Sequence, residues 1–168
     1  MRVPYILPFF IYKGLATKPV STICCIKNIT WKECTPFVPP IEKGQVIKVY
    51  DGDTITVAAK LPYPDSQLYR FRVRLLGIDS PEMNGKSTEE KMAAREAQKA
   101  LEALILHKTV FIKNRGQEKY GRILANVYID NDEMLFVNKW LIDNKYAVPY
   151  NGKTKPDFVL REPINKTI

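Results

Sequence analysis

The chain has 168 residues, which is enough for one domain with a substantial hydrophobic core. Its 26 lysines and arginines exceed its 18 aspartates and glutamates, and the net charge of +8 favours a polyanionic partner such as nucleic acid. The single histidine argues against a histidine-rich zinc site and against a mechanism that needs two histidines. No apolar run reaches the roughly 20 residues of a membrane-spanning helix.

The first 40 residues differ in composition from the rest of the chain. They contain half of the 12 prolines and all three cysteines, Cys24, Cys25 and Cys34. Because this number is odd and two of the cysteines are adjacent, we predict unpaired thiols. We expect an irregular arm over residues 1–40 and a folded domain over residues 41–168. The start of the arm is basic and then apolar, as in targeting or anchoring segments, so both an intracellular and a secreted location stay open.

Three strands are predicted at the start of the folded domain. The β-branched stretches 45–50 and 54–59 are separated by Asp51-Gly52-Asp53, a turn sequence typical of hairpins. The third strand, over residues 69–76, alternates apolar side chains with arginines. We interpret two of these arginines as solvent-exposed surface charges, namely Arg70 and Arg72.

Helical periodicity replaces strand alternation after the third strand. Ser87 and Glu90 predict a capping box at the start of a helix. The apolar residues that follow at helical spacing are Ala93, Ala97, Ala100, Leu101 and Leu104. Strands are then predicted over 109–114 and 123–129, and a second helix over roughly 135–144. This order indicates an α+β, mainly β chain: an OB-type five-stranded barrel with a helix inserted after strand three, an architecture that suits oligonucleotide binding.

Acidic residues cluster in two of the predicted turns. Pro81 restricts Ser80 to an extended backbone, so the turn that carries Asp79 and Glu82 is expected to be stiff. Asp53 leaves the first hairpin turn beside the third strand, so we expect it to approach Asp79. Two carboxylates and a backbone carbonyl are ligands that suit Ca²⁺ or Mg²⁺. The alternative interpretation is that each motif only makes a turn.

Three motifs resemble those of a known family. The stretches YDGDT, RLLGIDSPE and EKYGRILANVYI, in this order around a helix, are similar to the staphylococcal nuclease (thermonuclease) family over roughly residues 45–150. The resemblance implies an OB-type barrel and a Ca²⁺-dependent endonuclease that hydrolyses DNA and RNA. Nucleic acid is then the expected partner. We expect the protein to be a monomer that needs no obligate protein partner.

The resemblance also implies a metal site. Asp53 and Asp79 fall on the family's two calcium carboxylates. Ser80 falls on a threonine whose backbone carbonyl binds the metal, so this change of side chain is expected to be harmless. Glu82 falls on the glutamate that contacts the metal's water and is usually assigned as the general base.

Five further residues match positions that contact the substrate in the family. Arg74 and Arg122 fall on the two phosphate-binding arginines, which with Glu82 form the expected catalytic set. The positions expected to flank the nucleotide are Lys119, Tyr120 and, by a looser alignment, Tyr150.

A second function stays open: a nuclease-like barrel that binds nucleic acid or a protein partner without cutting. Such a barrel would be expected to lose the charged residues of its site, whereas this chain retains Asp53, Arg74, Asp79, Glu82 and Arg122. Their presence favours the enzyme. The chain departs from the family after the barrel, where a substantial helix is usual but two prolines interrupt the last 18 residues.

Overall fold

A computed structural model describes residues 28–129 and 135–152 of the chain. The chain divides into two compact units, Met1–Thr35 and Pro36–Ile168, and each is described by itself. In the described part of the first unit, a short 3₁₀ helix, η2 (Trp31–Glu33), is capped by the Glu33 carboxylate, which accepts hydrogen bonds from the amide and hydroxyl of Thr30, both at 2.7 Å. The expected boundary after residue 40 stays a prediction.

The three cysteines lie in the first unit. Cys34 is exposed and forms no disulfide, which agrees with an unpaired thiol. Cys24 and Cys25 lie outside the described residues. Within the described residues, no helix combines the length and the apolar character needed to cross a membrane.

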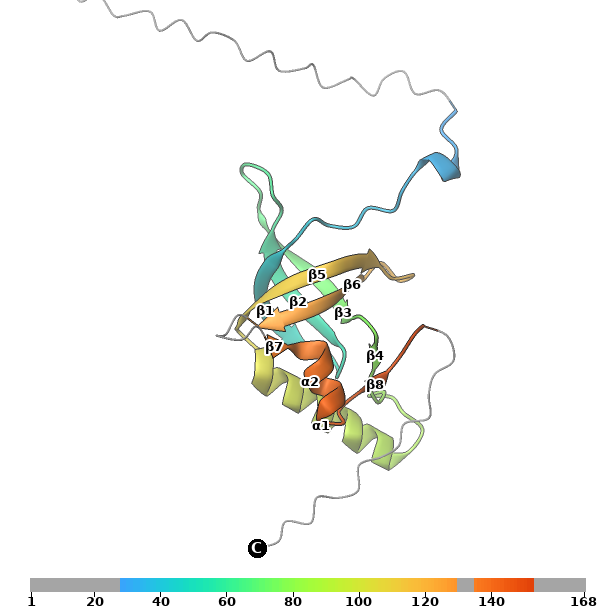
Figure 1. Cartoon of the computed structure of the whole chain (residues 1–168), viewed down its shortest axis with the longest axis vertical. Coiled ribbons are helices and arrows are strands. Elements are labelled where there is room, and N and C mark those ends of the chain that lie inside the picture. The colour runs from blue at the N-terminus through green and yellow to red at the C-terminus, as the bar shows by residue number, and fades with distance from the viewer. Residues whose placement is uncertain (1–27, 130–134, 153–168) are drawn as a thin grey trace, which may run out of the picture. The chain divides into compact units, whose positions relative to one another are not determined.

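A closed barrel forms the centre of the second unit (Figure 1). Neighbouring strands pair antiparallel in the order β3-β2-β1-β5-β6, and a parallel pairing of β3 with β6 closes the sheet on itself. The predicted OB-type, mainly β fold is therefore confirmed. The five barrel strands are β1 (Lys43–Val49), β2 (Thr54–Lys60), β3 (Leu68–Leu75), β5 (Thr109–Gln117) and β6 (Ile123–Ile129).

Strand alternation fills the barrel. In β2 and β3 the inward positions are apolar and buried, for example Ile55, Val57 and Val73, while the positions between them face outwards. Every second residue of β6, from Ile123 to Ile129, is likewise buried. The interior of the barrel is therefore packed with apolar side chains.

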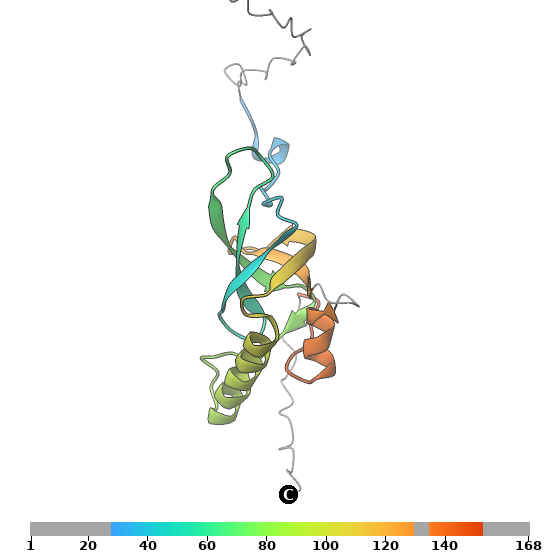
Figure 2. The same ribbon diagram turned by 90° about the vertical axis from the view of Figure 1, so that its left-hand side faces the viewer.

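Two helices lie at the same end of the barrel (Figures 1 and 2). The first, α1 (Thr88–Ile105), begins after Ser87, whose hydroxyl accepts a hydrogen bond from the Glu90 amide at 3.0 Å. Glu90, however, bonds to the Lys86 amide at 3.0 Å, so the reciprocal half of the predicted capping box is made one residue earlier than expected. The buried face of α1 consists of Ala94, Ala97, Leu101 and Ile105, which differs in part from the predicted set.

The second helix is shorter than predicted. It is α2 (Val137–Asp143), because Leu135–Phe136 pairs with β6 as a short strand, β7, before the helix starts. Buried Asn138 fixes α2 to the barrel: its carboxamide accepts from the Val127 amide at 3.0 Å and donates to the Leu76 carbonyl at 2.8 Å.

A two-stranded sheet holds the segment after β3. It consists of β4 (Ile78–Asp79) and β8 (Val148–Pro149), paired antiparallel, and neither strand was predicted. The Tyr150 amide also donates to the Gly77 carbonyl at 2.9 Å. The turn that begins at Asp79 is thus fixed on one side by β8 and Tyr150, which follow α2 in the chain.

Candidate functional site

Barrel closure places the ends of three strands together. Thr54 at the start of β2 is opposite Arg74 in β3, and Arg74 is in turn opposite Leu124 in β6. Asp53 and Arg122, which immediately precede β2 and β6, therefore lie on either side of Arg74. The Leu75 amide donates to the Asp53 carbonyl at 2.8 Å and fixes the register at this corner.

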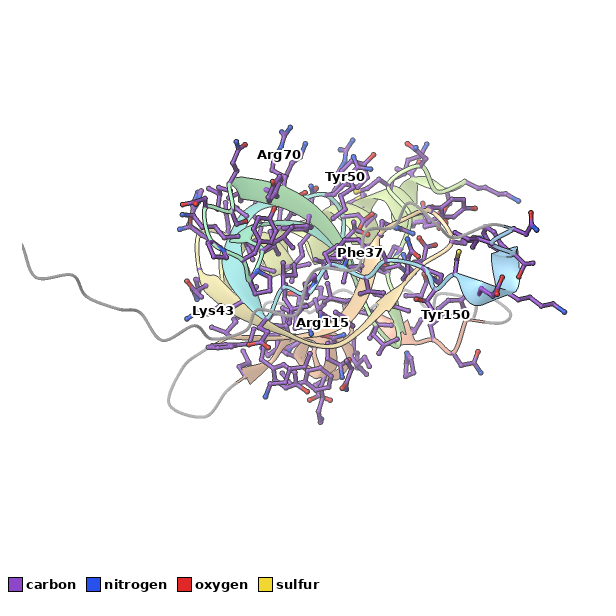
Figure 3. The ribbon with its side chains drawn as sticks, turned by 90° about the horizontal axis from the view of Figure 1, so that it is seen from above. Phe37, Lys43, Tyr50, Arg70, Arg115 and Tyr150 are labelled. Atoms are coloured by element: carbon purple, nitrogen blue, oxygen red, sulfur yellow. The ribbon has the colours of Figure 1, made fainter. Side chains whose placement is uncertain are left out.

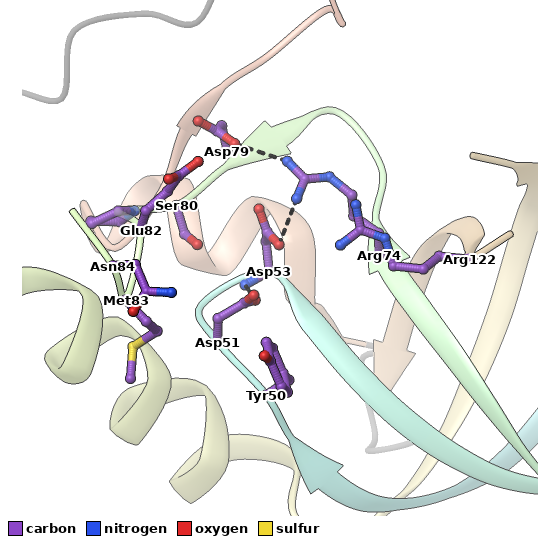
Figure 4. A pocket seen from close by; sticks show the side chains of 11 residues that line it. Tyr50, Asp51, Asp53, Arg74, Asp79, Ser80, Glu82, Met83, Asn84 and Arg122 are labelled. Carbon is purple, nitrogen blue, oxygen red and sulfur yellow. Dashed lines mark hydrogen bonds and ion pairs between the residues drawn. The ribbon is translucent and has the colours of Figure 1, made fainter. Parts of the chain in front are cut away.

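Arg74 bridges the two acidic turns (Figure 4). Its Nη1 lies 2.9 Å from Oδ1 of Asp53, and its Nη2 lies 2.8 Å from Oδ1 of Asp79. Both carboxylates are buried, and only 17% of the arginine side chain is exposed. The expected approach of Asp53 to Asp79 is thus present in the structure, with one guanidinium between the two carboxylates.

The site opens as a polar pocket of about 270 Å³. It is lined by all six residues that the sequence proposed for metal binding and catalysis: Asp53, Arg74, Asp79, Ser80, Glu82 and Arg122. In Figure 4, Ser80 and Glu82 follow Asp79 on one side of the pocket, and Arg122 lies next to Arg74 on the other. Sequence reasoning gave no role to Tyr50, Asp51, Met83 and Asn84, which also line it.

Arg122 belongs to a hydrogen-bonded chain that ends at the acids. Its Nε lies 3.1 Å from Oε2 of Glu118, and its Nη1 donates to the Thr54 hydroxyl at 3.3 Å. The same hydroxyl donates to Oδ1 of Asp53 at 2.9 Å. Glu118 was missed from sequence because its spacing from Arg122 has meaning only on a helix, whereas here a turn brings them together. The bond from Arg122 is the main cause of a lowered pKa at Glu118.

Burial raises the pKa of Asp53 from 3.8 to about 7, and the Asp51 carboxylate adds to the shift, while Arg74 opposes it. Between these two pH values the folded protein retains a proton that the unfolded chain has released. The free energy of unfolding of the metal-free protein must therefore fall as pH rises through this range. A buried anion of this kind also favours a cation beside it.

We expect Asp53→Asn to remove this pH dependence. Relative to wild type in excess chelator, the variant should gain about 2 to 3 kcal/mol in free energy of unfolding between about pH 5 and about pH 8, measured by urea denaturation. Asp65→Asn, in the exposed β2–β3 turn, is the control and should show no such gain. A difference between Asp53→Asn and wild type that stays constant with pH would contradict the shift.

Gly52 packs the first acidic turn against the second and against α1. A Cβ atom at this position would lie 2.8 Å from Cβ of Ser80 and 2.9 Å from Cβ of Ala97, both of which are attached directly to backbone. Only glycine therefore allows the Asp51–Asp53 turn to approach Ser80 this closely.

The Gly52→Ala variant should be destabilised by about 1 to 3 kcal/mol in thermal or urea unfolding, because the added methyl group must push these segments apart. The matched control is Gly116→Ala, where the nearest atom to the new Cβ is the Leu124 carbonyl oxygen at 3.9 Å. Equal stability of the two variants would show that the close approach at Gly52 relaxes without cost.

The three residues expected to flank a nucleotide do not line the pocket. Lys119 and Tyr120 are exposed on the turn before Arg122, with the Lys119 ammonium 4.7 Å from the centre of the Tyr120 ring. The Tyr120 hydroxyl is the main cause of a raised pKa at Lys119, and Tyr150 is close enough to contribute. Their contact with substrate stays a prediction.

The oxygen atoms of the site suit a hard cation. Among the described residues, no three side chains of His, Cys, Asp or Glu are grouped so that they hold a metal by themselves. The predicted set instead combines the Asp53 and Asp79 carboxylates with the Ser80 backbone carbonyl. Both carboxylates already contact one cationic group, and buried carboxylate and carbonyl oxygens are ligands of Ca²⁺ and Mg²⁺. The residues present therefore fit such an ion.

The fold and the site together define a class of protein: a small closed barrel with a pocket of acids and arginines at the ends of its strands. The model of the family described as "Staphylococcal nuclease homologue" matches residues 72–163, more than half of the chain, and the protein belongs to this family. The match contains five of the six candidate residues that line the pocket and omits only Asp53.

Curated relatives match at similar identity. Uncharacterized protein MJ1439 of Methanocaldococcus jannaschii is 30% identical over 77% of this chain and 72% of that protein. Protein ParB of Escherichia coli is 31% identical over 71% of this chain and 55% of its own length. A protein of Escherichia coli named "Uncharacterized endonuclease" is 32% identical over 59% of this chain, which spans 55% of that relative.

Proposed function

We propose that this protein is a metal-dependent endonuclease that hydrolyses phosphodiester bonds of DNA or RNA, with Ca²⁺ as its cofactor. One observation carries the proposal: a single pocket joins Arg74 and Arg122 to the carboxylates of Asp51, Asp53, Asp79 and Glu82. Membership of the nuclease family and a relative named as an endonuclease support the same reading.

The charge balance of the pocket supports the metal. Four carboxylates face two arginines, so the ionised pocket has a formal charge of −2 and would repel a phosphate. We assign Asp53, Asp79 and the Ser80 carbonyl as the residues that hold the ion. A bound divalent cation supplies positive charge that attracts the phosphate and polarises its oxygens.

The two arginines act on the phosphate group. A guanidinium donates parallel hydrogen bonds to two phosphate oxygens, a geometry that stabilises the additional negative charge of the transition state. Arg122 is positioned by its hydrogen bonds to Glu118 and Thr54. Arg74 is held next to the proposed ion ligands by its hydrogen bonds to Asp53 and Asp79.

Glu82 is the candidate general base. It lies on the rim of the pocket, in the turn held by Pro81, which is buried. In the proposed step the Glu82 carboxylate accepts a proton from the attacking water while the oxygen of this water bonds to phosphorus. The bond from phosphorus to the leaving sugar oxygen breaks, and this oxygen takes a proton from the solvent to which the pocket is open.

The test is cleavage of end-labelled DNA and RNA by the purified full-length chain with Ca²⁺, with Mg²⁺ or with excess chelator. We expect cleavage only with added metal and best with Ca²⁺, because the proposed ligands are all hard oxygens. Full activity in chelator would contradict the metal assignment. Binding without cleavage under every condition would instead favour the non-catalytic barrel.

A further inference from the structure

The outer face of β1, β2 and β3 is basic and contains no acid. Together these strands contain six lysines and arginines and no aspartate or glutamate. Thr56 in the middle strand pairs with Lys48 on one side and with Arg72 on the other, so the two cations flank it on one face. Pairing of Ala58 with Arg70 continues the row away from the pocket. We call Lys48, Tyr50, Lys60, Arg70 and Arg72 the basic face.

These cations are not neutralised by neighbouring acids. In the described part of the chain, no carboxylate lies within ion-pair distance of Lys48, Arg70 or Arg72. Arg74, two residues further along the same strand, is in contrast held by two aspartates. The nearest acids in sequence lie outside the strands, Glu42 directly before β1 and the others in the turns that follow β1 and β2, so within the strands every charged side chain is basic.

Tyr50 connects the basic face to the pocket. Tyr50 is 54% exposed and also lines the pocket. The Arg72 guanidinium lies 5.6 Å and the Lys48 ammonium 5.9 Å from the ring centre. The Gln98 side chain, from α1, donates to the Tyr50 carbonyl at 3.1 Å and helps to fix this segment. In Figure 3, Tyr50 and Arg70 lie on the same side of the barrel.

We propose that the basic face binds the single-stranded part of the substrate that extends out of the pocket. This inference rests on the proposed function, because it extends the binding site for the same nucleic acid. The exposed Tyr50 ring has Lys48 and Arg72 over it at 5.9 and 5.6 Å. A base that stacks on this ring in place of the cations leaves both of them next to the neighbouring phosphates, which they then contact. Bases of a duplex are already stacked on each other, so this arrangement favours a single strand. The row of Arg70 and Arg72, about 7 Å apart along the strand, continues the phosphate contacts.

The experiment compares affinity for two lengths of single-stranded DNA in chelator, so that binding is measured without cutting. Fluorescence anisotropy gives Kd for a labelled dinucleotide and for an oligonucleotide of about 12 nucleotides, which exceeds the pocket. The test variant is Arg70→Gln/Arg72→Gln. The control is Lys108→Gln/Lys113→Gln, which removes the same charge from the residue directly before β5 and from within β5, where both side chains are exposed.

We expect the arginine variant to bind the long oligonucleotide at least about 10-fold more weakly at about 0.1 M salt, because two phosphate contacts are lost. The slope of log K against log salt should fall in magnitude by about 1.4, while the control variant keeps the wild-type slope. Circular dichroism checks that both variants are folded. Equal weakening by both variants would overturn the proposal, because net charge alone would then explain the effect.

A duplex of the same length separates the substrate classes. We expect it to bind wild type more weakly than the single strand and to respond less to Arg70→Gln/Arg72→Gln; an equal response would overturn the single-strand assignment. If wild type cuts no nucleic acid with any metal, the proposed function fails, but the affinity of Arg70→Gln/Arg72→Gln for the long single strand, relative to the control variant, still decides whether this face binds single strands.

Discussion

The Arg74→Lys variant is expected to lose roughly 10²- to 10³-fold in kcat/KM for oligonucleotide cleavage, although the substitution keeps the charge. Arg74 contacts Asp53 at 2.9 Å and Asp79 at 2.8 Å through two different nitrogens. A lysine ammonium is a single point charge on a flexible chain and cannot reproduce this fork while it also contacts a phosphate.

The Arg122→Lys variant should also lose about 10²-fold, since Arg122 contacts Glu118 and Thr54 through two nitrogens. Arg95→Lys, on the exposed surface of α1, is the matched control and should cut at the wild-type rate. Single-turnover cleavage with saturating Ca²⁺ is the measurement for all three variants. Near-normal rates for both site variants would show that the arginines act only through their net charge.

The alternating sequence of the long strands made the barrel predictable, whereas the two-residue strands could not be recognised from the sequence. Alternating burial in β2, β3 and β6 follows directly from alternating sequence. The short strands β4 and β8 have no period to detect, because each contains only two residues. Their pairing nevertheless fixes the backbone at Asp79, so a feature invisible in the sequence positions a proposed metal ligand.

The candidate residues were predictable by type and resemblance, but their mutual contacts were not. The hairpin turn and the Ser-Pro turn indicated where Asp53 and Asp79 would project. That one arginine would bridge them depends on the register of β2 with β3 and on the closure of β3 against β6. The same tertiary pairing brings Glu118 and Thr54 to Arg122, and nothing in the local sequence of Thr54 marks it as a partner of that arginine.

Interpreting Arg70 and Arg72 as surface charges was compatible with their exposure but left out their surroundings. An exposed ion pair between a surface arginine and a neighbouring acid has little energetic effect. Here the cross-strand neighbours of Arg70 and Arg72 are Ala58 and Thr56, and Arg72 lies over the ring of Tyr50 at the pocket. Strand register, which the sequence leaves open, distinguishes an isolated charge from a continuous basic face.

The second large effect is expected at Glu82. Glu82→Gln keeps the shape of the side chain at the rim of the pocket but removes its charge and its basicity. If Glu82 accepts the proton of the attacking water, the turnover rate should fall by roughly 10²-fold or more, because that interaction is made mainly in the transition state. Substrate Kd should not rise, since removing one of four carboxylates in the pocket makes the site less repulsive to a phosphate.

Single-turnover rates and equilibrium binding of the same oligonucleotide, at one salt concentration and with saturating Ca²⁺, separate these two quantities. Glu89→Gln, which removes an equal charge from the exposed first turn of α1, is the control and should change neither quantity. If Glu82→Gln cuts at the wild-type rate, proton transfer to Glu82 is not part of the mechanism. If its rate falls only in proportion to weaker binding, Glu82 positions the substrate or the ion, and another group must accept the proton.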